Sequence, residues 1–108
     1  MTEPPAGPSD PGTVVMELGG DIGALILYTP AELNGREIEI SRADDPAAGR
    51  THSQVRPRHT PGATRYAAVY PDLAAGPYTI WRDQHSPAAA TVIAGGQVTT
   101  SHWPEPGG

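Results

Sequence analysis

Cysteine, lysine and phenylalanine are all missing from this chain of 108 residues. Without cysteine the chain can form neither a disulfide nor a thiolate metal site. No apolar run approaches the ~20 residues that span a bilayer, and residues 1–5 have neither the basic start nor the apolar segment of a secretory signal. These absences predict a cytoplasmic protein with no membrane span.

Positive charge is also scarce. Seven arginines stand against twelve acidic residues, which gives a formal net charge of −5. Nucleic-acid-binding proteins have a basic footprint, so we expect no nucleic-acid partner. The length is that of one domain, and such a domain buries roughly 60–70% of the surface of its unfolded chain.

Short segments of strand-forming residues, separated by glycine and proline turns, dominate the chain between residues 13 and 103. Alternation and β-branched or aromatic content predict strands at residues 13–18, 22–28, 36–41, 51–58, 65–70, 78–81, 91–94 and 97–102. Gly95-Gly96 predicts a hairpin joining the last two, and Pro57 places the strand at 51–58 on a sheet edge. We therefore expect an all-β fold, a seven- or eight-stranded antiparallel β-sandwich.

The two ends of the chain differ in composition from the predicted sandwich. Residues 1–12 contain four prolines and almost no apolar side chain, which predicts a disordered N-terminal tail. Residues 104–108 are predicted to be a C-terminal tail. The sandwich domain is therefore expected at residues 13–103.

One stretch resembles a known group of β-sandwiches. Residues 66–81 hold an aromatic strand, then a leucine, a short gap and a Gly-x-Tyr-Thr-apolar pattern, carried by Leu73, Gly76, Tyr78, Thr79 and Ile80. With residues 91–101, this stretch resembles the carboxypeptidase-regulatory-like and collagen-adhesin B-type group. The resemblance implies a prealbumin-like (transthyretin-like) fold and an accessory module that binds or assembles.

The chain departs from the active members of that fold. The absence of lysine excludes the internal Lys–Asn isopeptide bond of adhesin repeats. The last four residues are Glu-Pro-Gly-Gly rather than the Tyr-Arg-Gly-Ser of the purine-degrading transthyretin-like hydrolases. No Gly-x-Ser-x-Gly elbow supports a phospholipase-like activity. We expect a non-enzymatic binding or assembly module without cofactor; the alternative is a small hydrolase acting on an anionic substrate.

Residues 46–71 contain four arginines and no acidic residue. On a continuous strand at 51–58, alternation puts His52, Arg56 and Arg58 on one face. With Arg65, that face is suited to clamping a phosphate, sulfate or carboxylate. Two alternatives stay open. Acidic side chains of the strand at 36–41 pair with this face, or the face meets an acidic partner or a second copy of the chain, as in a homodimer formed through this edge.

The two tryptophans and four histidines have plainer alternatives to a functional role. Trp81 and Trp103 sit at or near strand ends, where they either contact a partner or pack against the sandwich. No two histidines have the i, i+2 spacing that places both on one strand face, so we predict no metal site, while a zinc or copper site built from distant loops stays open.

Overall fold

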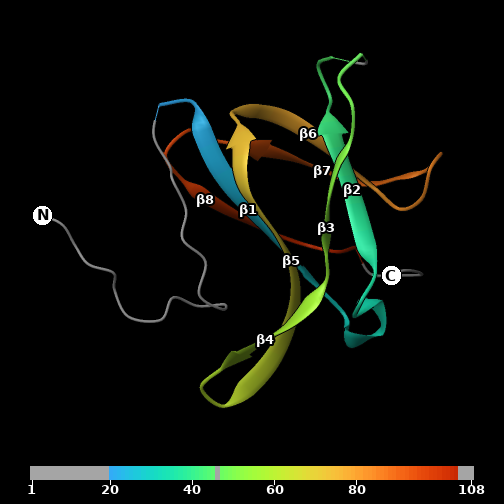
Figure 1. The fold of residues 1–108 in the computed structure, drawn as a ribbon, viewed down its shortest axis with the longest axis vertical. Coiled ribbons are helices and arrows are strands. Elements are labelled where there is room, and N and C mark those ends of the chain that lie inside the picture. Colours follow the sequence, from blue (N-terminus) through green and yellow to red (C-terminus); the bar gives the residue numbers. More distant parts are fainter. Residues whose placement is uncertain (1–19, 46, 105–108) are drawn as a thin grey trace, which may run out of the picture.

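Two four-stranded sheets pack face to face in the computed structural model of the protein, which describes residues 20–45 and 47–104 (Figure 1). The elements are β1 (Ile22–Thr29), η1 (Ala31–Leu33), β2 (Glu37–Arg42), β3 (Thr51–Gln54), β4 (Arg56–Thr60), β5 (Ala63–Ala74), β6 (Gly76–Trp81), β7 (Pro87–Ile93) and β8 (Val98–His102). The predicted tail at 1–12, the predicted strand at 13–18 and residues 105–108 lie outside the described residues. Within the described residues, no helix is long and apolar enough to cross a membrane.

Sheet A has the strand order β4-β5-β1-β8, and sheet B has the order β3-β2-β6-β7. Neighbouring strands are antiparallel except for β1 and β8, which run parallel. The all-β sandwich predicted from the alternation is therefore confirmed, with one parallel pair. The prealbumin-like topology stays a prediction.

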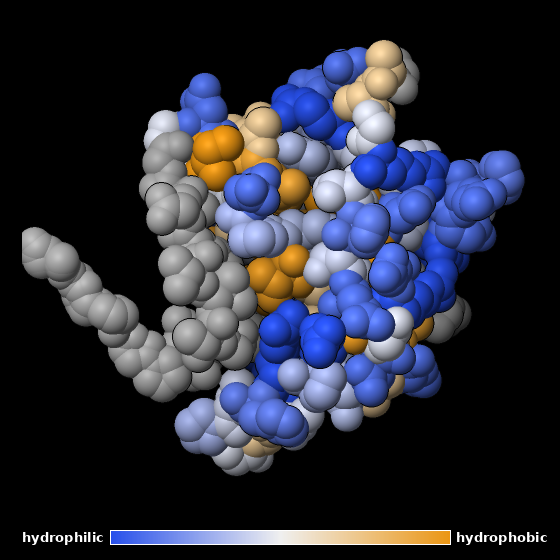
Figure 2. All heavy atoms as spheres, viewed as in Figure 1, coloured by the Kyte–Doolittle hydropathy of each residue, from blue (hydrophilic) through white to orange (hydrophobic). Residues whose placement is uncertain are grey.

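The core fills the space between the sheets, because every second side chain of a strand points to the same face. Leu25 and Leu27 of β1 belong to the same core cluster as Ile38 and Ile40 of β2, and all four are at most 1% exposed. The Tyr70 hydroxyl donates a 2.7 Å hydrogen bond across this space to the Ile38 carbonyl oxygen. Burial raises the pKa of Tyr70, so the phenol stays protonated as a donor. Polar residues cover most of the face drawn in Figure 2, with small apolar patches between them.

The predicted strand at 51–58 is wrong in one respect: it breaks at Val55, which is fully buried. The Val55 amide donates to the Arg36 carbonyl oxygen, and its own carbonyl oxygen accepts from the Gly35 amide. Burial of this side chain turns the backbone inward, so β3 belongs to sheet B and β4 to sheet A. Both are outermost strands, which confirms the edge position predicted from Pro57.

A side-chain hydroxyl joins the sheets beside this crossing. The Ser53 hydroxyl on β3 donates to the Val69 carbonyl oxygen on β5 at 2.7 Å, and accepts from the Val69 amide at 3.2 Å. The pairing of β4 with β5 stops at Ala67, so Ser53 supplies the next pair of backbone contacts. The Ser53 hydroxyl therefore links β3 of sheet B to β5 of sheet A.

The predicted hairpin at Gly95-Gly96 is also wrong, because β7 lies in sheet B and β8 in sheet A. The connection bonds to the start of β1 instead: the Gly96 amide donates to the Ile22 carbonyl oxygen, and the Ala24 amide donates to the Gln97 carbonyl oxygen. These bonds align β8 parallel to β1. His102 is thereby placed directly beside Tyr28.

Val55→Ala should lower the free energy of unfolding by about 2 kcal/mol, because it empties a fully buried site at the crossing between the sheets. Val92→Ala is the matched control, since that side chain is 67% exposed and its truncation should change stability by at most about 0.5 kcal/mol. Urea unfolding of both variants measures the difference. Equal losses in the two variants would contradict the buried crossing.

Candidate functional site

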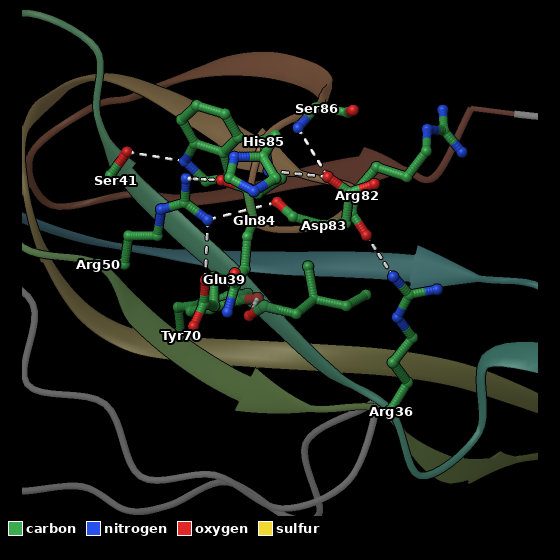
Figure 3. Close-up of polar contacts among 12 residues, drawn as sticks. Arg36, Glu39, Ser41, Arg50, Tyr70, Arg82, Asp83, Gln84, His85 and Ser86 are labelled. Carbon is green, nitrogen blue, oxygen red and sulfur yellow. Dashed lines mark hydrogen bonds and ion pairs between the residues drawn. The ribbon is translucent and has the colours of Figure 1, made fainter.

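Sheet B carries a polar network around Arg50 (Figure 3). The Arg50 guanidinium donates to Glu39 at 2.9 Å, to the Gln84 carbonyl oxygen at 2.8 Å and to the Asp83 carbonyl oxygen at 3.3 Å. A guanidinium with a carboxylate and two carbonyl partners has most of its donors occupied. Arg50 therefore fastens the loop after β6 to strand β2.

Trp81 belongs to the same network. Its indole N–H donates to the Ser41 hydroxyl at 2.9 Å, and the Arg50 guanidinium lies 3.8 Å from the ring centroid. This cation–π contact covers the indole, so the structure favours packing over a partner contact for Trp81.

His52 also lies on sheet B, at the outer edge of the Arg50 network. It is opposite Glu39 in the strand register, and its Nε2 is 3.6 Å from a carboxylate oxygen of Glu37. The expectation that His52 shares one strand face with Arg56 and Arg58 fails, because the chain changes sheets at Val55. The acidic pairing left open in the sequence is observed for His52 alone.

Sheet A carries the other three predicted site residues, which we call the basic face: Arg56, Arg58 and Arg65. Arg58 of β4 is directly opposite Arg65 of β5, and directly opposed residues of an antiparallel pair share a face. Their neighbour Ala67 packs in a small apolar cluster separate from the main core. The basic face is therefore on the outer side of sheet A, away from the core.

The arginines of the basic face form no ion pair with any acidic residue in the part of the chain that the structure describes. Arg56 donates to the Gln54 side-chain oxygen, and Arg58 makes a long 3.4 Å contact with the Ala67 carbonyl oxygen. The Arg58 Nε atom is buried and has no hydrogen-bond partner among the described residues. Burial, followed by repulsion from Arg56, lowers the pKa of Arg58.

An aromatic pair adjoins the basic face at the end of β1. The Arg65 guanidinium lies 4.0 Å from the Tyr28 ring centroid, and the Tyr28 and His102 rings stack at 5.4 Å. These side chains line an open hollow of about 420 Å³, shared with Thr64 and Tyr66. A guanidinium, an imidazole and two phenols around one hollow suit a ligand with an anionic group and an apolar body.

Sequence reasoning did not identify Tyr28 and His102 as site residues. Tyr28 reads as the end of a buried strand, and His102 as an isolated histidine. Only the parallel pairing of β1 with β8 brings their rings together, and no local pattern in the sequence predicts that pairing.

Trp103 also lines this hollow, yet it is only 6% exposed and belongs to the main core. Its amide donates to the Tyr28 carbonyl oxygen, and the guanidinium groups of Arg36 and Arg82 lie 6.0 and 5.4 Å from its ring centroid. The structure therefore favours the packing interpretation for Trp103. Within residues 20–45 and 47–104, no three histidine or acidic side chains gather as a metal site would require.

Comparison with known proteins gives no match to a family model, a curated protein or a solved structure. The resemblance to prealbumin-like modules therefore depends on the pattern in residues 66–81 and 91–101 alone. The function must be argued from the chemistry of the two sheet faces.

Arg50→Gln should make Trp81 more accessible to solvent, because it removes the cation that covers the indole. Acrylamide should then quench tryptophan fluorescence more strongly than in the wild type, with a stability loss of about 1 kcal/mol. Arg56→Gln is the matched control, because Arg56 contacts neither tryptophan ring. Unchanged quenching in Arg50→Gln would contradict the stacked arrangement.

Acid should destabilise the protein through Asp44 and Asp83. A hydrogen bond from Arg42 lowers the pKa of Asp44, and backbone N–H groups of His85 and Ser86 lower the pKa of Asp83. The stability that both carboxylates contribute is present above about pH 4 and is lost as pH falls through their lower folded-state pKa values.

The measurement is the free energy of unfolding as a function of pH. The double variant Asp44→Asn/Asp83→Asn should flatten the acid limb of this curve. Asp72→Asn is the control, because Asp72 has no ion pair within the described residues. An acid limb equally steep in the double variant and the wild type would contradict this assignment.

Proposed function

We propose that this protein is a non-enzymatic binding module that takes an anionic group on the basic face of sheet A. The observation that carries the proposal is the opposed pair of Arg58 and Arg65, which has no acidic partner among the described residues. Like charges directly opposite each other destabilise a sheet, and a partly buried guanidinium without a partner adds a desolvation cost. A bound anion offsets both the repulsion between the two arginines and the desolvation cost of the buried guanidinium.

The arginines of sheet B support the proposal by contrast. Arg42 holds Asp44 through two hydrogen bonds of 3.0 and 3.1 Å, and Arg50 holds Glu39 at 2.9 Å. Acidic partners are therefore supplied within the described structure for Arg42 and Arg50, while Arg36 and Arg82 lie against the ring of the buried Trp103 instead. Arg58 and Arg65 have no acidic partner among the described residues, as expected if their partner is a ligand.

The chemistry of the face defines the ligand class. Guanidinium groups bind phosphate, sulfate and carboxylate in bidentate fashion. The hollow beside Tyr28 and His102 has room for the body that carries such a group, either a small molecule or a side chain of a partner protein.

The alternative functions draw less support. Hydrolysis of an anionic substrate by His52, Arg56 and Arg58 together is not favoured, because His52 lies on sheet B beside Glu37. Homodimerisation through one continuous edge at 51–58 is not favoured either. That edge is divided at Val55 between two sheets, and Pro57 removes one backbone donor that an added strand would need from β4.

Inorganic phosphate or citrate should raise the melting temperature of the wild-type protein at constant ionic strength. Arg58→Gln and Arg65→Gln should each weaken this response, because a hydrogen bond to a charged group contributes about 1.5–3 kcal/mol, or roughly 10–100-fold in affinity. Amide chemical-shift titration supplies the dissociation constants.

Arg50→Gln is the charge-matched control on sheet B. It should lower the melting temperature without changing the affinity for phosphate or citrate. The proposal fails if neither anion shifts the amides of β4 and β5, or if Arg50→Gln and Arg58→Gln lose affinity equally.

A further inference from the structure

Each strand of sheet A contributes one side chain to a row that crosses the sheet in the order β4-β5-β1-β8. In that order the side chains are Arg58, Arg65, Tyr28 and His102. The Arg65 guanidinium lies 4.0 Å from the centre of the Tyr28 ring, and the His102 ring stacks on the same phenol at 5.4 Å between ring centres. The imidazole therefore ends a row that begins with the proposed anion site.

His102 is close enough to Arg65 to share an anion with it. The guanidinium carbon and the centre of the imidazole are no farther apart than the sum of their distances to the Tyr28 ring centre. An oxyanion that accepts charge-assisted hydrogen bonds of about 2.7–2.9 Å from both sides bridges a gap of this size. Both side chains are exposed and line the same open hollow, so a ligand can approach them together.

The hollow provides no acidic partner for a charged imidazole. His102 forms no ion pair within the described part of the chain, and no acidic residue is among those that line the hollow. The other titratable or charged groups of the hollow are Tyr28 of β1 and Arg65 and Tyr66 of β5. Strand β7, which also contacts β8, has no titratable side chain. Glu32 of η1 is exposed and does not line the hollow.

The other three histidines have different surroundings. His52 is 3.6 Å from a carboxylate oxygen of Glu37, so its cationic form has a partner within the fold. His85 lies in the loop after β6, on the side of sheet B. His59 of β4 has its Nδ1 atom 3.1 Å from the hydroxyl of Thr64, which lines the hollow. His59 is therefore the histidine that a test must distinguish from the one that ends the row.

We propose that His102, in its protonated form, is a further binding residue of the anion site, so that the module takes up its anion together with a proton. The inference rests on the proposed function, because the anion is the one held by Arg58 and Arg65. An imidazole ordinarily titrates near pH 6.5. The additional charge-assisted hydrogen bond is therefore present in mildly acidic solution and is lost as the pH rises.

The coupling between the proton and the anion has a direct electrostatic cause. Without an anion, a charged His102 is repelled by the guanidinium of Arg65. With an anion between them, each cation gains a partner. Protonation then raises the affinity for the anion, and by linkage the bound anion favours protonation to the same extent.

Sulfate is the probe, because it keeps both of its negative charges between about pH 5.5 and about pH 8, the range in which an imidazole titrates. Asp44 and Asp83 stay ionised in this range, since hydrogen bonds lower the pKa of each carboxyl. Amide chemical-shift titrations of the full chain at constant ionic strength give the dissociation constant at each pH. The wild type should bind sulfate about 10-fold more tightly at the lower pH, as expected for one more hydrogen bond between charged groups.

Three single variants assign the effect to one histidine. His102→Gln keeps a polar side chain that cannot become charged, so its affinity for sulfate should be the same at both pH values. His52→Gln is the matched control on sheet B and should keep the 10-fold change of the wild type. His59→Gln should keep this change as well. Persistence of the pH dependence in His102→Gln, or its loss in His59→Gln, would overturn the assignment.

The ring signals of the histidines give a second measurement in the wild type. Because linkage is reciprocal, sulfate should move the titration midpoint of the His102 ring protons to higher pH. The midpoints of His52 and His85 should stay in place. An unmoved midpoint for His102, or equal movement of all three, refutes the proposal.

The proposed function and this inference fail separately. Sulfate binding that shifts the β4 and β5 amides equally strongly at both pH values refutes this inference and leaves the proposed function. Shifts of the His102 ring and the β8 amides, without any shift in β4, refute the Arg58–Arg65 site and leave His102 as an anion-binding residue. Absence of sulfate binding at either pH refutes both.

Discussion

Burial of Val55 is the constraint on which the distribution of charge depends. The side chain enters the core between two polar neighbours, and its backbone is held by Arg36 and Gly35. This inward turn sends β3 to sheet B and β4 to sheet A. His52 therefore faces the glutamates of β2, whereas Arg56 and Arg58 face outward from sheet A without them. One buried valine thus separates a surface that carries acidic partners from one whose arginines have no acidic partner among the described residues.

Local pattern predicts most of the strands but not their sheets. Alternation together with β-branched or aromatic content located β1, β2 and β6, and Pro57 correctly indicated an edge, because these signals depend on residues close together in the sequence. In the sequence, the strand pattern continues without a break through Val55 and up to Gly95-Gly96. Crossing from one sheet to the other is decided by distant contacts, such as those of Val55 with residues 35 and 36. The predicted strand at 51–58 and the predicted last hairpin failed for this reason.

The candidate site likewise has one part that follows from local sequence and one part that depends on distant contacts. The Arg58–Arg65 pairing follows from a two-residue turn, since Pro61-Gly62 sets Thr60 opposite Ala63 and fixes the register of the hairpin. The sequence alone therefore suffices to place these two arginines next to each other. Tyr28 and His102 could not be grouped in this way, because they lie more than seventy positions apart on strands that pair in parallel. The contact of His52 with Glu37 and the ion pair of Arg50 with Glu39 likewise depend on which segments the fold places side by side.

The contrast between the two sheets argues that the unpaired arginines are kept for a purpose outside the described fold. A chain with nearly twice as many acids as arginines has the means to neutralise every cation, and on sheet B it does so for Arg42 and Arg50. Opposing Arg58 and Arg65 instead breaks a local rule of sheet stability. Such violations concentrate at functional sites, where a partner supplies the missing interaction.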